Sequence, residues 1–391
     1  MPLQMIRLRL AALALLAGAS QVAATELSAL PDSVAGAMAQ ASPQVSPQAM
    51  AEYRRKLQEW EEAQAPFEAY WNSIAEKRRG RNAKRRAGQQ VTLDDYVLTQ
   101  PPVYTGPKRP IDPSAPERPP RKAIPMVPDL IQAAADHFQF APQRPANEID
   151  FKRAYARVAA ASGLTKEQAV RVYSFETGGN GNYDMQSGYR GPGTRPISTA
   201  IGYNQLLTTN SVELMAEQGD ALLKALRDKA ATLSGAPRKA MEDKIAVMKK
   251  MVAFAKSVPD TWSDHEKLAN TEQGWALHAM VLDIDVGPHL QTHKLLTSVI
   301  FARAKGYTKP LTAAELEMMN LTGDGTGLDM VTMPQAMREQ VPTSNFFQRG
   351  GYERNPVASR NNTVAKLLAV TNERMDVNSA KPGAQDLAAS F

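Results

Sequence analysis

Residues 165–179 have the sequence TKEQAVRVYSFETGG, which contains the start and the end of a helix. Thr165 and Gln168 stand at the spacing of a capping box, where each side chain binds the main chain of the other residue. Gly178 and Gly179 follow at the other end, and glycine is a strong helix stop. The stretch therefore predicts a helix over 165–176 with a fixed beginning and a fixed end.

Glu176 is the last residue of this predicted helix and lies on its apolar side. Ala169, Val172 and Tyr173 recur at the three- and four-residue spacing of one helix face, and Glu176 is the next position on that face. Burial disfavours an ionised carboxyl group, and so does the partial negative charge of a helix C-terminus. Both effects raise the pKa, as a general acid working near neutral pH requires. A glutamate that bends out to solvent is the simpler alternative.

Composition limits the chemistry that the chain can perform. The chain has 391 residues and a net charge of +6, and it contains no cysteine. Disulfides, thiolate nucleophiles and cysteine metal sites are therefore excluded. The length allows two average domains, or one domain with long extensions. The positive charge suits an anionic partner, which could be nucleic acid, a membrane surface or a cell-wall polymer, and charge alone does not choose among them.

The first 24 residues have the pattern of a secretory signal peptide. Arg7 and Arg9 precede an apolar run over 10–17, and small residues occupy 22–24. The run is shorter than the roughly 20 residues of a membrane-spanning helix, and no later segment qualifies. We therefore expect an exported protein, periplasmic or secreted from a bacterium, with no integral membrane segment once the signal is removed.

Residues 25–125 are expected to form an extension before the main domain. Residues 25–50 resemble a flexible leader, and residues 51–79 are expected to be helical, kinked at Pro66. One face of this helix has alternating four- and three-residue spacings, and Gln64 is its only polar member: Tyr53, Leu57, Trp60, Gln64, Phe67, Trp71 and Ile74. Such a face packs on its own domain or on a partner protein, which would be reached through residues 51–86.

A basic run and a proline-rich segment complete the extension. The basic run, over 77–86, predicts a solvated tail; the functional alternative in an exported protein is contact with anionic wall polymer or lipid headgroups, not with nucleic acid. The proline-rich segment, over 100–128, predicts an extended linker or a strap lying on a surface. The domain boundary is placed near 125.

Residues 126–375 are predicted to form one mostly helical α+β domain, followed by a tail over 376–391. The periodicity predicts helices over 129–139, 147–162, 165–176, 210–233, 236–257, 264–283, 290–305 and 312–320. Between 178 and 207 glycine and proline interrupt the periodicity, and short strands are expected over 183–189 and 197–206. Glu176 would then lie where this small β lobe joins the helices, a common place for a cleft.

Three motifs in this region give the chain a resemblance to a known family. The first is Glu176-Thr177 at a helix end. The second is Ala200-Ile201-Gly202-Tyr203-Asn204-Gln205, and the third is Met319-Asn320 before the glycine-rich stretch 323–327. In this order they resemble the lysozyme-like lytic transglycosylases, which cut peptidoglycan glycan strands. The match departs from the family pattern at Tyr203, Asn204 and Met319, and the gap from Glu176 to Gln205 is longer than usual.

The resemblance implies a lysozyme-like fold and a lyase that needs no cofactor. Glu176 would protonate the glycosidic oxygen and then take the proton of the 6-hydroxyl, leaving a 1,6-anhydro end. The resemblance also implies that Gln205 and Asn320 contact the substrate, and that Gly202 and Tyr203 hold a sugar ring, with Tyr203 as a stacking face. The family usually has tyrosine at the position of Met319. Tyr352 or Phe347 could supply the aromatic wall that this tyrosine would form.

Two alternative functions remain open from the sequence. Asp184 is the only other acid between Glu176 and Gln205, so a hydrolytic muramidase with two carboxylates is one alternative, although Asp184 in a Gly- and Asn-rich loop is typical of a turn. The other alternative is a peptidoglycan-binding module without activity, which the departures from the family pattern suggest.

The histidines predict no metal site. His289 and His293 have the spacing of two zinc ligands on a helix, and His278 precedes them, but Leu290 stands where metalloproteases have glutamate. His265, between two acids, is expected to be a solvated helix start.

Overall fold

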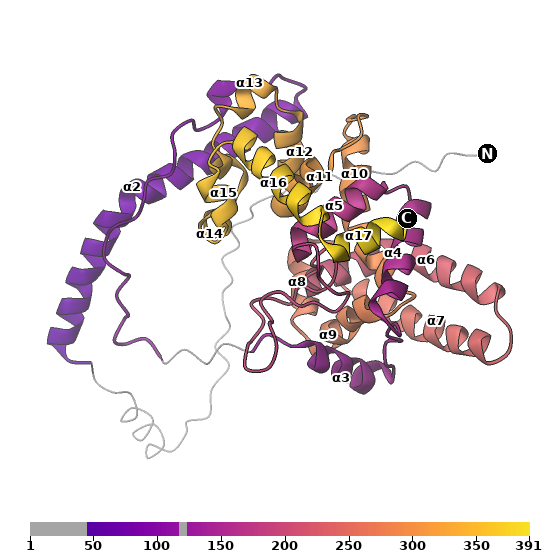
Figure 1. Ribbon diagram of the computed structural model, residues 1–391. Coiled ribbons are helices and arrows are strands. Elements are labelled where there is room, and N and C mark those ends of the chain that lie inside the picture. Colours follow the sequence, from indigo (N-terminus) through magenta and orange to yellow (C-terminus); the bar gives the residue numbers. More distant parts are fainter. Residues whose placement is uncertain (1–44, 117–122) are drawn as a thin grey trace, which may run out of the picture. The chain divides into compact units, whose positions relative to one another are not determined.

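The computed structural model describes residues 45–116 and 123–391 (Figure 1). Internal contacts divide these residues into two compact units. The smaller unit contains residues 45–60 and 108–116, and the larger unit contains residues 61–107 and 123–391. The predicted signal peptide and most of the predicted leader lie outside the described residues.

Within the smaller unit, a helical segment contacts a proline-rich segment. The guanidinium group of Arg109 lies over the ring of Trp60, 5.1 Å from its centroid. This cation–π contact joins the two stretches of sequence that make up the unit.

The described residues are mostly helical. The elements follow one another as α2 (Pro47–Arg86), η1 (Leu93–Asp95), α3 (Val127–Phe138), α4 (Glu148–Ala161), α5 (Lys166–Thr177), α6 (Thr208–Ala231), α7 (Gly235–Ala255), α8 (Trp262–Ala269), α9 (Glu272–His278), η2 (Ala279–Leu282), α10 (Gly287–Ala304), α11 (Ala313–Thr322), α12 (Asp324–Thr332), α13 (Gln335–Arg338), η3 (Thr343–Phe346), α14 (Arg349–Glu353), α15 (Pro356–Arg360), α16 (Val364–Ser379) and α17 (Pro382–Ala389). The helices predicted from periodicity are confirmed within a few residues, apart from 264–283.

Residues 264–283 form two helices and a 3-10 turn in place of one long helix. The break falls at Thr271, whose side chain accepts a hydrogen bond from the main-chain nitrogen of Gly274. A threonine in this role starts a new helix. The prediction of a single helix was wrong because apolar periodicity continues across the break and conceals it.

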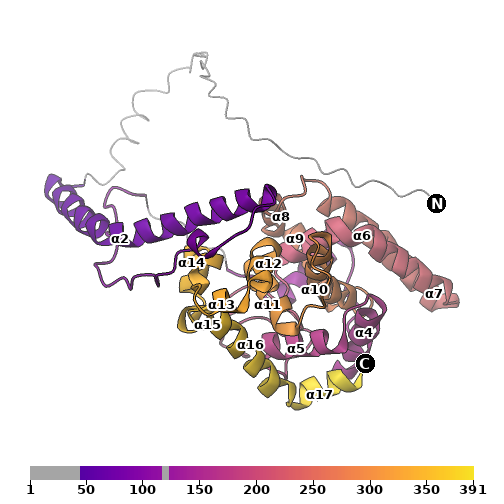
Figure 2. The ribbon, with the colours of Figure 1, turned by 90° about the horizontal axis from the view of Figure 1, so that it is seen from above.

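Helix α5 is surrounded by other helices of the larger unit. Helices α4, α11, α16 and α17 all contact it, and Figure 2 shows α16 and α17 beside it. Ala169, Val172 and Tyr173 are fully buried, as the apolar face predicts. The surroundings of Glu176 are therefore set by packed helices and not by mobile loops.

Helices α6 and α7 form an antiparallel hairpin (Figures 1 and 2). Lys244 on α7 is 3% exposed and its Nζ lies 2.8 Å from Oδ1 of Asp283; it also pairs with Asp285. A buried lysine needs such partners, because an unpaired buried charge is costly. The pairing fixes the hairpin to the segment before α10.

The two strands expected over 183–189 and 197–206 are absent. This region holds only isolated bridges, between Gln186 and Ile201 and between Ile201 and Leu206. Gly188, Gly191, Gly193 and Gly202 all have positive φ angles, which a regular strand cannot contain. The segment 178–207 is therefore an irregular lobe, and the described part of the chain is mostly α.

The apolar face predicted for the N-terminal helix packs within the larger unit. Phe67, Trp71 and Ile74 are buried, and Trp71 contacts the ring of Tyr352 edge-on at 5.6 Å. Gln64, the polar member of the face, accepts a hydrogen bond from Arg349. The residues of this face from 64 to 74 therefore pack within their own unit, and a partner bound through residues 51–86 stays a prediction. The helix continues through Pro66 without interruption.

The basic run is not a solvated tail. Arg81 is 1% exposed; its guanidinium group lies 3.3 Å from Asp329 and donates to the carbonyl oxygens of Asp95 and Asn345. Arg78 donates to the carbonyl oxygens of Asn345 and Phe347. Four other basic residues of the run, Lys77, Arg79, Arg85 and Arg86, are exposed as predicted. The prediction was wrong for Arg78 and Arg81, because sequence shows the charge of a run but not the acceptors that the fold brings to it.

Two domain limits also differ from the prediction. Residues 61–107 belong to the same unit as the helices after 126, so 125 is not a boundary between compact units. Residues 376–391 are not a tail: they contain the end of α16 and all of α17, whose Ala384 and Leu387 are fully buried. The proline-rich residues 97–107 lie on the larger unit, where Val97 and Gln100 bind Asn345 and Asn362.

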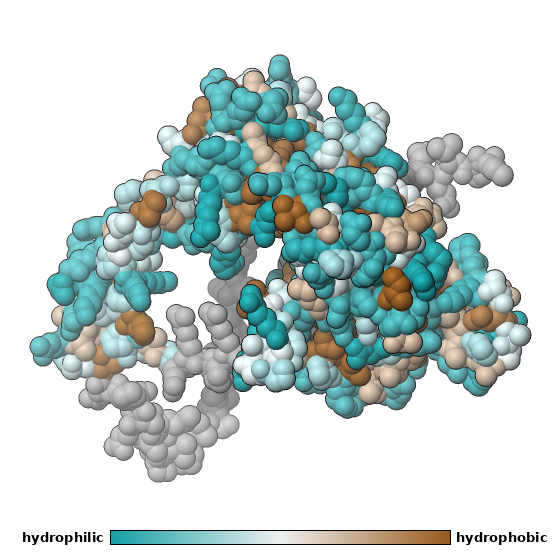
Figure 3. All heavy atoms as spheres, in the orientation of Figure 1, coloured by the Kyte–Doolittle hydropathy of each residue, from teal (hydrophilic) through white to brown (hydrophobic). Residues whose placement is uncertain are grey.

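Hydrophilic side chains predominate on the face drawn in Figure 3, and hydrophobic ones are scattered over it. Among the described residues, no helix has both the length and the apolar content needed to span a bilayer.

We expect Arg81→Ala to lower the free energy of unfolding by about 3 kcal/mol, because the change leaves a buried Asp329 with fewer partners. Arg85 and Tyr96 still contact Asp329, which keeps the loss at the lower end of the range for a broken buried pair. Urea denaturation measures the effect. Arg79→Ala, at an exposed position of the same helix, is the matched control; equal losses in the two variants would contradict the assignment.

Candidate active site

Glu176 lies in the last turn of α5, as predicted. The Thr165 hydroxyl accepts from the main-chain nitrogen of Gln168, and the Gln168 side chain accepts from that of Thr165, both at 3.1 Å. Gly178 ends the helix with a φ angle of 68°. The capping box and the glycine stop are therefore confirmed, and they fix the position of Glu176 in the chain.

The Glu176 carboxyl group is partly buried and faces α11. Its Oε1 accepts a hydrogen bond of 3.0 Å from Nδ2 of Asn320. Glu317, one helical turn before Asn320, also approaches Glu176, and it is fully buried. The structure thus brings Glu176 and Asn320 together, two of the residues that the sequence selected from segments 144 positions apart.

Electrostatics at this pair favour retention of a proton. Burial raises the pKa of Glu176 above that of an ordinary glutamate, although Lys294, Glu317 and Asn320 each oppose the rise. Burial raises the pKa of Glu317 well above that of an ordinary glutamate, and the negative charge of Glu176 raises it more. No hydrogen bond of ordinary geometry reaches the Glu317 oxygens within the described residues. Glu317 is therefore the group that holds a proton most firmly.

Sequence reasoning did not select Glu317. Its signal was present, because Glu317 stands three residues before Asn320 on an apolar helix, where both residues share one face. An acid on such a face needs a partner or a proton. The presence of Glu176 on the facing helix could not be read from that spacing.

A cavity of about 410 Å³ reaches Asn320, the partner of Glu176, but neither Glu176 nor Glu317 is among the residues that line it. Its lining comes from α6, α8, α10, α11 and the start of α12, and consists of Leu207, Asn210, Glu213, Leu214, Glu217, Trp262, Lys294, Thr297, Ser298, Met319, Asn320, Gly323 and Asp324. Asn320 both lines the cavity and binds Glu176. The cavity is thus connected to the acid pair through one amide side chain.

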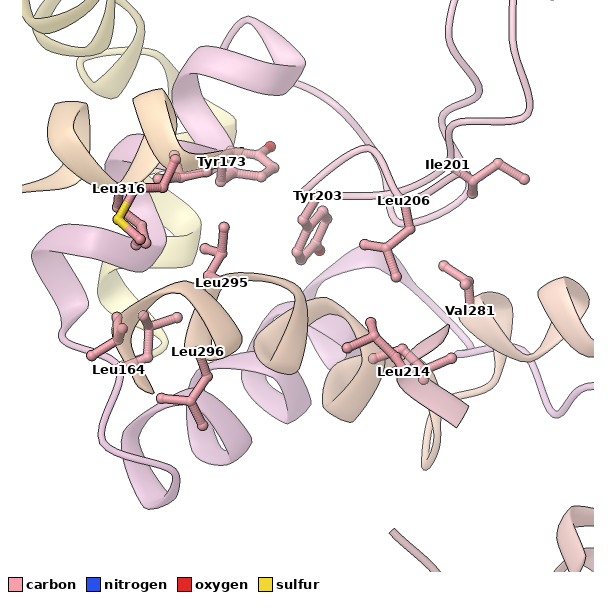
Figure 4. Packing of buried hydrophobic residues seen from close by; sticks show 14 of the residues in the cluster. Leu164, Tyr173, Ile201, Tyr203, Leu206, Leu214, Val281, Leu295, Leu296 and Leu316 are labelled. Atoms are coloured by element: carbon pink, nitrogen blue, oxygen red, sulfur yellow. The ribbon is translucent and has the colours of Figure 1, made fainter. Parts of the chain in front are cut away.

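Tyr203 is not a stacking face. Its side chain is fully buried and makes edge contacts with Phe151, Tyr155 and Tyr173. Its hydroxyl donates to Glu148. Figure 4 shows Tyr203 among buried side chains that include Tyr173. The prediction was wrong because a tyrosine in a glycine-rich loop can turn into the core as readily as out of it.

The neighbours of Tyr203 are also structural. Asn204 is fully buried, and its side chain donates to the carbonyl oxygen of Gln291 and to the hydroxyl of Tyr155. Gly202 has a φ angle of 83°, and an added Cβ would lie 2.1 Å from Nε2 of Gln291, so a larger residue would be strained and would displace that amide group. Gly202 serves a tight packing contact; the structure offers no surface at this position to a sugar ring.

Gln205 is turned toward its own loop. Its φ angle is 44°, and its Nε2 donates to the carbonyl oxygens of Gly202 and Met185. It is not among the residues that line the cavity beside Asn320. The structure therefore does not bring Gln205 into that cavity with Asn320.

Asp184 is engaged elsewhere. Its carboxylate pairs with Arg144, which also donates to the Tyr183 hydroxyl. Asp184 is not among the groups that shift the pKa of Glu176. This arrangement agrees with the simpler interpretation from sequence, in which Asp184 is a turn residue and not a catalytic carboxylate.

The remaining aromatic and histidine candidates have structural surroundings. Tyr352 and Phe347 are buried against the N-terminal helix and lie outside the lining of the cavity. His278 is fully buried between the hydroxyl of Ser211 and the carbonyl oxygen of Thr199, and burial lowers its pKa to about 4. His265 is 1% exposed and so is not a solvated helix start.

Among residues 45–116 and 123–391, no cluster of three or more His, Asp or Glu side chains has the arrangement of a metal site. Comparison of the chain with family models, with curated proteins and with solved structures yields no match.

The raised pKa of Glu317 gives a prediction for stability. The folded protein binds more protons than the unfolded chain between the two pKa values, so the free energy of unfolding falls as pH rises through that interval. A full proton difference is worth about 1.4 kcal/mol per pH unit. Glu317→Gln removes this group, and the variant should lose less stability than the native protein between about pH 5 and about pH 8.

Urea denaturation at the two pH values tests this prediction. Glu266→Gln, at an exposed position on α8, is the control and should follow the native protein. A pH dependence that is unchanged by Glu317→Gln would show that Glu317 is not the proton-holding group.

Proposed function

We propose that the protein is a peptidoglycan lytic transglycosylase of lysozyme-like architecture, with Glu176 as its single catalytic acid and base. The observation that carries the proposal is the partly buried Glu176, which lies next to the buried Glu317 and is bound by Asn320, a residue that lines a cavity. The sequence resemblance supplies the reaction class, and this geometry supplies a carboxyl group suited to it.

One carboxyl group is sufficient for both proton transfers of the proposed reaction. Protonated Glu176 gives its proton to the glycosidic oxygen as the bond to the anomeric carbon breaks, through an oxocarbenium-like transition state. The resulting carboxylate takes the proton of the 6-hydroxyl, whose oxygen bonds to the anomeric carbon. The products are a 1,6-anhydro sugar and a new hydroxyl end, and Glu176 regains its proton.

Glu317 and Asn320 have supporting roles in this proposal. Glu317 keeps its own proton, so the site carries no second negative charge next to the Glu176 carboxylate that forms during the reaction. Asn320 donates to Oε1 of Glu176 and orients the group. Asn320 is thus a positioning residue with a face on the cavity.

The surroundings of Asp184 and Glu317 argue against a hydrolase that uses either of them with Glu176; three other carboxyl groups, Glu213, Glu217 and Asp324, line the cavity. A hydrolase needs a second carboxylate that reaches the sugar or its attacking water. Glu317 is fully buried and Asp184 pairs with Arg144, so neither group is placed for this role. A peptidoglycan substrate lies outside the cytoplasm, in keeping with the signal peptide predicted for residues 1–24.

We expect Glu176→Gln to reduce cleavage of purified peptidoglycan at least about 100-fold, because general acid catalysis is lost while the side-chain shape is kept. A turbidity assay measures the rate, and mass spectrometry should find 1,6-anhydro ends in the native digest. Glu167→Gln, in the exposed first turn of the same helix, is the matched control and should cleave normally. Undiminished cleavage by Glu176→Gln, or reducing ends in place of anhydro ends, would refute the mechanism.

The hydrogen bond from Asn320 gives a second prediction. It stabilises the charged form of Glu176, so Asn320→Ala should raise the Glu176 pKa further. The alkaline limb of the kcat/KM profile, where the acid loses its proton, should then move up by about 0.5–1 pH unit. Asn270→Ala, at the exposed C-cap of α8, should leave the profile unchanged; a shift to lower pH in Asn320→Ala would contradict the assignment.

A further inference from the structure

The cavity beside Asn320 has a flat apolar face at its rim. Trp262, the first residue of α8, lines the cavity and is 46% exposed, although a large aromatic side chain is usually more deeply buried. Nothing in the acid–base chemistry of Glu176 uses this ring. An exposed indole at the edge of a polar cavity is suited to the apolar face of a ring-shaped ligand.

Lys294 is a cation in the cavity without a direct partner. It is largely buried on α10, and its ammonium group makes no hydrogen bond or ion pair with any described residue. Four carboxyl groups on other helices attract it at longer range: Glu176, Glu213, Glu317 and Asp324. A ligand that enters the cavity can supply the missing acceptor, and hydroxyl oxygens would do so.

Glu217 is a carboxyl group in the cavity that lacks a donor, whereas Lys294 lacks an acceptor. It stands one helical turn after Glu213 on α6, so both carboxyl groups face the cavity. Glu217 accepts no hydrogen bond within the described residues, and Glu213, Asp260 and Asp324 all act on it with the same sign of charge. Glu217 is therefore short of a positive charge and of hydrogen-bond donors, whereas Glu213 is approached by Lys294 and Asn210.

The lining as a whole is acidic. It contains Glu213, Glu217 and Asp324 against the single base Lys294. Ser298 donates to Asp324 and thereby holds that carboxylate in the wall. A cationic ligand would therefore be attracted, and an acidic one repelled.

We propose that this cavity binds a sugar unit with a free amine, a non-acetylated hexosamine of the glycan strand. Its ring would stack on Trp262, its ammonium group would donate to Glu217 and Glu213, and its hydroxyl groups would accept from Lys294. The identification of the glycan strand as peptidoglycan rests on the proposed function. The preference for a ring-shaped cation rests on the lining of the cavity alone.

This ligand suits the lining better than two related groups. An N-acetylated sugar offers the ring and the hydroxyl groups but leaves the Glu217 end without a cation. A free amine on a peptide stem offers the cation but has neither a ring face for Trp262 nor hydroxyl groups for Lys294.

Calorimetric titration of the full-length protein with a glucosamine tetrasaccharide and with its N-acetylated counterpart tests the proposal. The free-amine form should bind at least about tenfold more tightly, the effect of one charge-assisted hydrogen bond. Glu217→Gln should remove this preference, and Trp262→Ala should weaken both sugars about tenfold. Glu242→Gln, exposed on α7, is the control and should bind as the native protein does.

Equal affinity for the two sugars, or a preference that survives Glu217→Gln, would overturn the proposal. So would equally tight binding of a lysine-containing peptide. Because the titration measures binding without cleavage, its outcome is independent of the Glu176 test. Cleavage by Glu176→Gln together with an amine preference would remove the lyase mechanism and keep this site.

Discussion

The site depends on one electrostatic constraint: two carboxyl groups on facing helices, α5 and α11, approach each other away from bulk solvent. Two ionised carboxylates so placed would repel each other, so the pair retains a proton. Lys294 limits the rise in pKa, and Asn320 holds Glu176 from the cavity side. Burial by the packed helices, and not a special residue type, is therefore what raises the pKa of Glu176.

The packing that creates this environment also uses residues that the sequence motif assigned to substrate. Tyr203 and Gly202, with the neighbouring Asn204, fill the space between the irregular lobe and α4, α5 and α10, and all three are buried. Tyr155 and Tyr173 both contact Tyr203 there. The hydroxyl groups of the three tyrosines bind Glu148, Asn204 and the carbonyl oxygen of Gly181. The lobe is consequently held by its core, although it contains no regular strand.

The N-terminal helix contains arginines that the sequence predicts to be exposed but that are buried in the fold, Arg81 above all. Its apolar face packs against the segment that carries Tyr352, and the arginines beyond it find Asp329 and several carbonyl oxygens. Arg81 also lies over the ring of Tyr96, 4.3 Å from its centroid. Guanidinium groups suit this role because they offer several donors in one plane. The basic run is therefore part of the larger unit's architecture.

The sequence by itself determined where most helices lie, how α5 begins and ends, and that Glu176 belongs to its apolar face, because capping and periodicity are local properties of the chain. Only the tertiary structure decided that Glu317 is the neighbour of Glu176, that Tyr203 points inward, and that Trp262 and Lys294 share a cavity. These contacts join residues far apart in the chain, and short-range spacing carries no information about which helix faces which.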